Sequence, residues 1–328
     1  MSDAEAPLAV LGGGAWGLAL AASRARAGDR VRLWARDAET VSAVNAGRPA
    51  PRLPGAALPA GIEAMADVAE ALAGAALVLV VVPVRATAEV ARLAAPHAPR
   101  DAVWLMCSKG LAPTGAGLRL PHEIAADALG PDARVGVLSG PSFAADVAAG
   151  LPTAVSVALA DGAAGRARRL SSPALRCYAT DDVAGVAWGG ALKNVVAIAA
   201  GIAAGRGLGA SAHAALVARG HREIVRIATA NGARAETLAG LSGLGDLVLT
   251  ASSPQSRNYA HGLALGRGEA PAVATVEGVA TTASVAALAR ERGIRVPLVD
   301  ALHTILHGGG AIDATIRALL ERPVGPEL

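Results

Sequence analysis

Short runs of apolar residues alternate with alanine-rich helical stretches through the first half of the chain. The run Leu77–Val82 (LVLVVV), stopped by Pro83, is typical of a strand buried on both faces. Strands separated by helices indicate βαβ units, so we predict an α/β fold with a doubly wound, mostly parallel sheet. The predicted strands are Leu8–Leu11, Val31–Trp34, Leu77–Val82, Val103–Met106, Val135–Leu138, Val155–Ala158 and Arg176–Ala179.

The strand signals fade after Asp182, and the rest of the chain has a helical pattern. Ser211 is the expected N-cap of one helix, and Asn231-Gly232 is its expected C-terminal signal. We therefore predict a sheet domain over residues 1–183 and an all-helical domain over residues 184–328. The predicted helices are Ala184–Ala204, Ser211–Asn231, Arg257–Leu265, Thr282–Arg292 and Pro297–Leu306.

Composition excludes several classes of function. The 328 residues carry a net charge of only +3, with scattered arginines and 2% aromatic residues, which argues against a nucleic-acid partner. Two cysteines and seven histidines, none at ligand spacing, argue against a disulfide framework and a metal site. The uncharged run Ala6–Ser23 does not suit a targeting signal, because it is glycine-rich and follows Asp3 and Glu5 rather than basic residues. The uncharged run Asn194–Gly205 is too short to span a bilayer as a helix. We expect a soluble cytoplasmic protein without membrane insertion.

A glycine motif follows the first predicted strand, where Gly12–Gly17 (GGGAWG) satisfies the pattern GxGxxG. In a βαβ unit, Gly12 permits a tight turn, Gly14 lets a pyrophosphate approach the backbone, and Gly17 lets the helix pack on the strand. The N–H groups at the helix N-terminus then bind the anion. A glycine-rich turn without a ligand is the alternative, but the context favours binding of NAD or NADP.

The choice between NAD and NADP rests on two adjacent residues near the end of the second strand, Arg36 and Asp37. An acid at this place would hold a ribose hydroxyl, whereas an arginine would bind the additional phosphate of NADP. An exposed pair in a turn is the alternative for both. The pattern leans slightly towards NADP.

Of the 30 Lys and Arg residues only two are lysines, Lys109 and Lys193. Lys109 follows the strand Val103–Met106, at the sheet edge where ligands bind, although it could be an ordinary loop lysine. Lys193 lies within an apolar helical stretch, where a lysine either snorkels to the surface or is desolvated for a purpose. Because arginine stays protonated while a buried lysine can exchange a proton, we predict that Lys193 is catalytic.

Three further polar segments have both a functional and a structural interpretation. Gly140-Pro141-Ser142-Phe143 could receive an oxyanion or form a turn in which Ser142 caps a helix. Asp246 could orient Lys193 and tune its pKa, or cap a helix. Ser256-Arg257-Asn258 could bind a phosphate or be a solvated helix start.

At these residues the sequence resembles the bacterial NAD(P)-dependent glycerol-3-phosphate dehydrogenase family. The resemblance implies a Rossmann domain, an all-helical second domain and a site in the cleft between them. It also implies hydride transfer between NAD(P)H and dihydroxyacetone phosphate, giving sn-glycerol 3-phosphate for phospholipid synthesis. The matching motifs are GGGAWG at 12–17, SKG at 108–110, SGPSFAADVAAGLPTA at 139–154, GGALKNVVAIAAG at 189–201, GLGDLVLT at 243–250, QSRN at 255–258 and VEG at 276–278.

By this resemblance Lys193 is the proton donor and acceptor, and Lys109 contacts both substrate and cofactor. The catalytic set is completed by Asn194, Asp246 and Thr250. The substrate-binding set adds Gly140, Ser142, Ser256, Arg257 and Asn258. The cofactor contacts are Gly12, Gly14, Ala15, Trp16, Gly17, Arg36, Lys109, Ala144, Arg257 and Glu277.

Two residues depart from the family pattern. Ala15 stands where serine or asparagine is common, which removes one pyrophosphate hydrogen bond, and Ser211 stands where asparagine is usual.

Two competing functions are a related two-domain dehydrogenase acting on a 3-hydroxy acid or sugar acid, and a cofactor-sensing module without turnover. A homodimer is compatible with the sequence, although no motif shows one.

Overall fold

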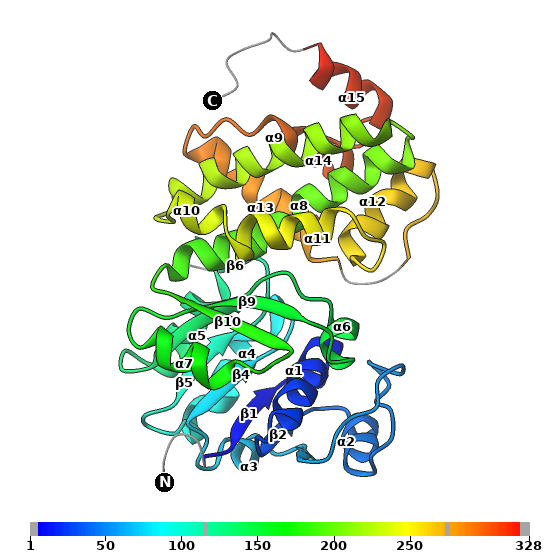
Figure 1. Ribbon diagram of the computed structural model, residues 1–328. Helices are drawn as coiled ribbons and strands as arrows, with labels where there is room; N and C mark the ends of the chain where they lie inside the picture. Colours follow the sequence, from blue (N-terminus) through cyan, green and yellow to red (C-terminus); the bar gives the residue numbers. More distant parts are fainter. Residues whose placement is uncertain (1–5, 115–116, 273–275, 322–328) are drawn as a thin grey trace.

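An eight-stranded sheet organises the chain up to Thr180 in the computed structural model, which describes residues 6–114, 117–272 and 276–321 (Figure 1). The strand order is β10-β9-β8-β5-β4-β1-β2-β3, and every pair is parallel except β8 with β9. The strands are β1 (Leu8–Leu11), β2 (Val31–Trp34), β3 (Ile62–Met65), β4 (Leu77–Val80), β5 (Val103–Met106), β8 (Arg134–Ser139), β9 (Thr153–Ala158) and β10 (Leu175–Thr180), beside a hairpin of β6 (Ala112–Thr114) and β7 (Gly117–Arg119).

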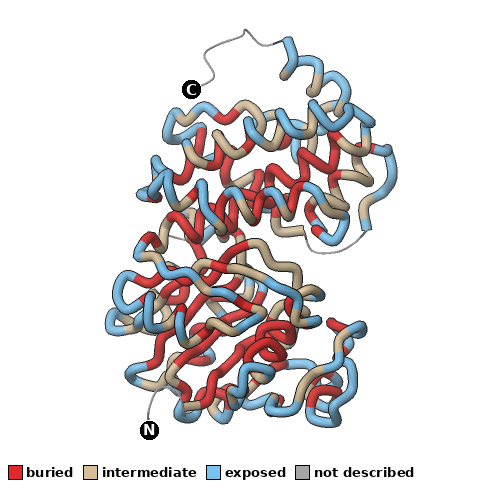
Figure 2. The backbone as a smooth tube through the Cα atoms, viewed as in Figure 1, coloured by how far each residue is buried: buried red, intermediate tan, exposed pale blue. Residues whose placement is uncertain are grey.

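Helices cover both faces of this sheet, because the strands are apolar on both sides. In β1, Leu8 and Val10 enter one hydrophobic core while Ala9 and Leu11 enter the core on the opposite face. Figure 2 shows the resulting buried layer through the sheet. The helices of this region are α1 (Ala15–Arg26), α2 (Ala38–Asn45), α3 (Val68–Leu72), α4 (Thr87–Ala94), α5 (Pro121–Leu129), α6 (Ala144–Ala148) and α7 (Ala163–Leu170), with the short helices η1 (Val84–Ala86) and η2 (Ala95–His97).

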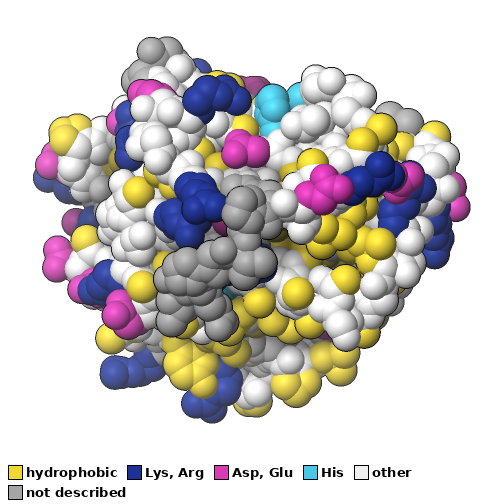
Figure 3. Space-filling view, turned by 90° about the horizontal axis from the view of Figure 1, so that it is seen from above, with side chains coloured by type: hydrophobic (Ala, Val, Ile, Leu, Met, Phe, Trp, Pro, Cys, Tyr) yellow, Lys and Arg dark blue, Asp and Glu magenta, His cyan; other side chains and the backbone are white. Residues whose placement is uncertain are grey.

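The second region is all-helical and is built around α8 (Val183–Gly205). In the described part of the chain, α8 is the helix long and apolar enough to cross a membrane, and its 18-residue apolar stretch is buried inside the protein. The outer face of this region presents basic side chains dispersed among acidic and apolar ones (Figure 3). The other helices are α9 (Gly209–Thr229), α10 (Ala235–Leu238), the π-helix η3 (Leu241–Gly245), α11 (Asp246–Ala251), α12 (Arg257–Arg267), α13 (Glu277–Glu291), α14 (Pro297–His307) and α15 (Ile312–Leu320).

Glycines allow α12 to pack backbone-to-backbone on α8. A Cβ atom at Gly262 would lie 2.0 Å from the carbonyl oxygen of Ile198, and one at Gly201 would lie 2.2 Å from that of Tyr259. No side chain fits at such distances, so the two helices meet only because both positions are glycine. This contact fixes the position of α12 against α8, the helix that carries Lys193.

The predicted fold class is confirmed, and each predicted strand and helix is present. The expectation that Ser211 caps a helix is wrong, because α9 begins at Gly209 with Leu208 at the cap. The same helix ends at Thr229, with Gly232 in the turn that follows at φ +86°. The sheet ends at Thr180 and α8 begins at Val183, whereas the domain boundary itself stays a prediction.

The contact between α8 and α12 generates a test of stability. Gly262→Ala should destabilise the protein by about 3 kcal/mol, at the upper end of overpacking costs, because rigid backbone obstructs the methyl group. Gly165→Ala is the matched control, since a Cβ in this exposed helical position of α7 meets no described atom within 4 Å. It should stabilise by about 0.5–1 kcal/mol. Chemical denaturation measures both, and equal effects would contradict the packing argument.

Candidate active site

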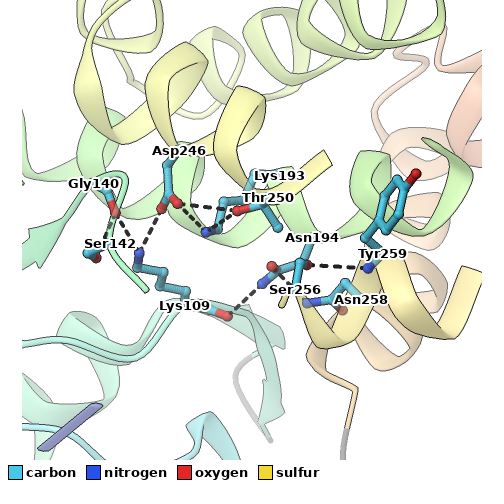
Figure 4. Close-up of polar contacts among 10 residues, drawn as sticks. All are labelled: Lys109, Gly140, Ser142, Lys193, Asn194, Asp246, Thr250, Ser256, Asn258 and Tyr259. Carbon is cyan, nitrogen blue, oxygen red and sulfur yellow. Dashed lines mark hydrogen bonds and ion pairs between the residues drawn. The ribbon is translucent and has the colours of Figure 1, made fainter. Parts of the chain in front are cut away.

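The site lies where the carboxyl ends of β5 and β8 face α8 and α11 (Figure 4). Lys109 follows β5 and Gly140 follows β8, as expected for ligand contacts in a parallel sheet. The helix reaches this edge through a glycine pair. A Cβ at Gly190 would lie 2.7 Å from Ser139 Oγ, and one at Gly189 would lie 2.8 Å from the Ser242 carbonyl oxygen.

A single carboxylate joins the two lysines of the chain. Asp246 Oδ2 lies 2.7 Å from Lys109 Nζ, and Asp246 Oδ1 accepts a hydrogen bond from Lys193 Nζ. Thr250, one turn further along α11, accepts a second bond from Lys193 Nζ at 2.8 Å. The helix-cap interpretation of Asp246 is wrong, because Gly245 occupies the cap and the carboxylate is 1% exposed between the lysines.

Burial brings the pKa of Lys193 close to neutral pH. Desolvation in the apolar helix lowers the pKa of Lys193 from 10.5 to about 7, against the opposing charge of Asp246. The nearby ammonium of Lys109 lowers it further. Lys193 is therefore buried rather than snorkelling, with a side chain only 8% exposed. An acid–base group is most effective when its pKa is close to the working pH.

A chain of amides ties the Lys109 loop to the helical region. Asn194 Nδ2 donates to the carbonyl oxygen of Lys109 at 3.2 Å, and Asn258 Nδ2 donates to Asn194 Oδ1 at 3.0 Å. The N–H of Gly278 completes it by donating to Asn258 Oδ1 at 2.9 Å. Both asparagines are buried. Sequence reasoning missed the contribution of Gly278, because a backbone donor has no signal in the sequence.

The loop after β8 enters the site through a backbone oxygen. The carbonyl oxygen of Gly140 accepts from Lys109 Nζ and from Ser142 Oγ, each at 3.0 Å. The alternative in which Ser142 caps a helix is wrong, since Phe143 precedes α6 as its cap. Ser142 thus contacts the lysine network indirectly, through Gly140.

The Ser-Arg-Asn segment at the start of α12 does not act as one polar trio. Ser256 caps the helix and accepts from the N–H of Tyr259 at 3.3 Å, as the helix-start interpretation expects. Asn258 is buried in the amide chain, whereas Arg257 is exposed in the first turn. The arginine is the member of the segment that an incoming anion could reach.

The glycine turn after β1 fits a dinucleotide. Cβ atoms at Gly12 (φ +135°) and Gly17 would lie 2.4 Å and 1.9 Å from backbone oxygens, so both glycines are required by packing. At Gly14, by contrast, no described atom lies within 4 Å of the Cβ position. This leaves room for a pyrophosphate at the N-terminus of α1, where Ala15 begins the helix. Trp16 Nε1 is buried there without a hydrogen-bond partner among the described residues.

Arg36 and Asp37, which bear on the choice between NAD and NADP, have different contacts in the structure. Asp37 caps α2 by accepting from the N–H and hydroxyl of Thr40 at 3.1 and 2.6 Å, and these bonds lower the pKa of its carboxyl. Arg36 lies over the Trp34 ring and forms an ion pair with Glu89. The acid is therefore engaged in local structure, and the guanidinium is the group presented at this edge.

The remaining expected cofactor contacts include the first residues of two helices. Ala144 is the first residue of α6. Glu277 begins α13, and its carboxylate occupies the space that a side chain at Gly110 would need, 2.8 Å from that Cβ position. Burial raises the pKa of Glu277, although the charges of Arg257 and Arg85 oppose this. Because Gly110 has no side chain, the Glu277 carboxylate can lie next to the loop that carries Lys109. Sequence reasoning did not single out this glycine.

Comparison with known proteins decides the family. Models of the N-terminal and C-terminal parts of NAD-dependent glycerol-3-phosphate dehydrogenase match residues 7–164 and 182–317. Proteins named glycerol-3-phosphate dehydrogenase [NAD(P)+] from Brucella canis and Mesorhizobium japonicum are each 52% identical, over 98% and 97% of this chain and 98% and 93% of their own. The chain belongs to the NAD-dependent glycerol-3-phosphate dehydrogenase family.

Solved structures agree with this membership. A crystal structure of glycerol-3-phosphate dehydrogenase from Coxiella burnetii is 40% identical, with a TM-score of 0.90 over 97% of this chain and 100% of that chain. D-mandelate dehydrogenase is 16% identical, with a TM-score of 0.62, covering 94% of this chain and 99% of its own. At this low identity, the comparison with D-mandelate dehydrogenase shows only that the two proteins share a fold.

Because the chain has two lysines, selective ¹³C-lysine labelling should give two Cε signals that can be titrated individually. We expect the Lys193 signal to titrate near pH 7. In Asp246→Asn its midpoint should fall further, because the carboxylate that favours the charged form is removed while burial remains. Asp313→Asn, on exposed α15, is the control and should change neither signal. A wild-type midpoint near 10.5 would refute the desolvated lysine.

Proposed function

We propose that the chain interconverts dihydroxyacetone phosphate and sn-glycerol 3-phosphate by hydride transfer with NAD(P)H, supplying glycerol 3-phosphate for phospholipid synthesis. Family membership makes it an NAD(P)-dependent oxidoreductase. The observation that carries the proposal is the Lys109–Asp246–Lys193 network, which joins the sheet region to the helical region. The network supports the proposal because it contains a buried lysine whose pKa, about 7, suits a proton donor.

In the direction of reduction, protonated Lys193 stabilises the charge that develops on the C2 oxygen and then donates its proton to it. The bound nicotinamide supplies the hydride. Thr250 and Asp246 hold the Lys193 amine in place through their hydrogen bonds. In the reverse direction the neutral amine accepts the hydroxyl proton. Lys109 adds positive potential, and Asn194 fixes the loop that carries it.

The substrate phosphate is assigned to the start of α12. Arg257 is exposed in the first turn of this helix, and the helix dipole favours an anion there. Binding energy from this remote group orients the carbonyl against the hydride donor. Ser256 and Asn258, at the start of the same helix, and Gly140 and Ser142, in the loop after β8, are the other proposed substrate contacts.

The cofactor is assigned to the turn after β1 and the edge beside it. Arg36 supports a slight preference for NADP, because Asp37 is already engaged as a helix cap. The proposed contacts are Gly12, Gly14, Ala15, Trp16, Gly17, Arg36, Lys109, Ala144, Arg257 and Glu277.

The alternative of a hydroxy-acid or sugar-acid dehydrogenase has only the shared fold in its support. The two lysines argue against a cofactor sensor, since binding alone requires neither of them to be lysine.

We also place the enzyme in the cytoplasm as a homodimer, with the domain boundary at residue 183. Light scattering of the purified protein tests the dimer.

The function is tested by following NADH and NADPH oxidation separately with dihydroxyacetone phosphate, beside a panel of keto acids. We expect turnover with dihydroxyacetone phosphate and none with the panel, because Arg257 requires a phosphate partner. Turnover confined to a keto acid would refute the proposal.

Lys193 variants test the proton donor. Lys193→Ala should lower kcat by roughly 10²–10⁴-fold with cofactor binding retained. Lys193→Arg keeps the charge but cannot release a proton, so it should remain impaired. In the wild type, kcat/KM for reduction should fall as pH rises through about 7, since the ammonium loses its proton there. Near-normal turnover of either variant would remove Lys193 from the mechanism.

Arg257→Ala should mainly raise KM for dihydroxyacetone phosphate, because the charge-assisted contact to the phosphate is lost. The control is Arg267→Ala, an exposed arginine at the opposite end of the same helix. Steady-state kinetics at fixed ionic strength compares the two. An unchanged KM in the first variant, or the same increase in both, would contradict the phosphate role.

A further inference from the structure

An ion pair crosses the carboxyl edge of the sheet above the glycine turn. Arg36 follows β2, and Glu89 lies in the first turn of α4, the helix that follows β4. Arg36 Nη2 and Glu89 Oε1 are 3.0 Å apart. In the sheet, β1 lies between β4 and β2, so the pair spans the end of β1.

This is the edge at which the adenosine half of a dinucleotide belongs. The chain order reverses between β1 and β4, and ligands of doubly wound sheets bind outside the carboxyl ends at such a switch point. The glycine turn packs directly on the segment that carries Arg36. A Cβ at Gly13 would lie 2.7 Å from the Cβ of Ala35. The ion pair therefore stands beside the pyrophosphate site, on the ribose side.

Arg36 is oriented by its contact with Trp34 as well as by its ion pair with Glu89. Its Cζ lies 5.6 Å from the centroid of the Trp34 ring, and Trp34 Nε1 is fixed by donating to the carbonyl oxygen of Ala66 at 2.8 Å. The side chains of Arg36 and Glu89 are 52% and 66% exposed, so an exchange of partners involves little desolvation. Asp37 does not compete for the guanidinium in this way, because it caps α2.

We propose that Glu89 determines cofactor specificity by competing with the 2′-phosphate of NADPH for the Arg36 guanidinium. The inference rests on the proposed function, because it concerns the cofactor of the same site. NADPH must displace the carboxylate from Arg36, whereas NADH, which has a hydroxyl at this position, leaves the ion pair intact. Glu89 thus weakens NADPH binding selectively and reduces the difference between the two cofactors.

Binding measurements without substrate test this directly. Fluorescence titration gives Kd for NADPH and NADH, and competition gives Kd for the fragments 2′,5′-ADP and 5′-AMP. Glu89→Gln keeps the size of the side chain and removes its charge. It should tighten NADPH and 2′,5′-ADP by roughly two- to fivefold, the scale of an exposed ion pair, with NADH and 5′-AMP unchanged. Glu291→Gln, an exposed carboxylate on α13, is the control.

The competitor role requires Arg36, so a double variant completes the test. Arg36→Gln should weaken NADPH by tenfold or more, and Arg36→Gln with Glu89→Gln should bind NADPH no more tightly than Arg36→Gln alone. Equal effects on both cofactors, or tightening that persists without Arg36, would overturn the proposal. Failure to turn over dihydroxyacetone phosphate would instead refute the proposed function, and it leaves these binding results valid.

Discussion

The Asp246 carboxylate between the two lysines is the interaction on which the site depends. Each of its oxygens serves one ammonium group, one from the loop after β5 and one from α8. Without this carboxylate, two like charges would be buried a few ångströms apart in an apolar environment, at considerable cost. The same contact joins the sheet region to the helical region, so the chemistry and the relative position of the two halves have a common origin.

The approach of α8 to the sheet follows from residues that lack side chains. Gly189 and Gly190 bring the helix against Ser242 and Ser139, and Gly201 receives α12 further along the helix. A helix surrounded so closely has little access to water along the turn that carries Lys193. The low pKa of this lysine is therefore a consequence of helix packing, and substitutions at distant glycines would alter it.

The sheet, the long helices and the two lysines could be predicted, because they rest on runs of apolar residues and on one compositional exception. The edge strand β3 was missed, since three of its four residues, Glu63, Ala64 and Met65, are types that favour helices over strands. Asp246 was ambiguous because its sequence environment suits a helix cap equally well, and the π-helix before α11 decides the matter. Contacts such as the one between Arg36 and Glu89 depend on which strands are neighbours, and local patterns do not carry that information.

The amide chain from Gly278 to Lys109 has a fixed polarity. A backbone N–H at one end can only donate and a backbone carbonyl at the other can only accept, so the two asparagines between them have a single orientation. Neither amide can flip without leaving two buried groups unpaired. This series of hydrogen bonds therefore has a single arrangement, and it holds the Lys109 loop at a fixed position relative to α12 and α13.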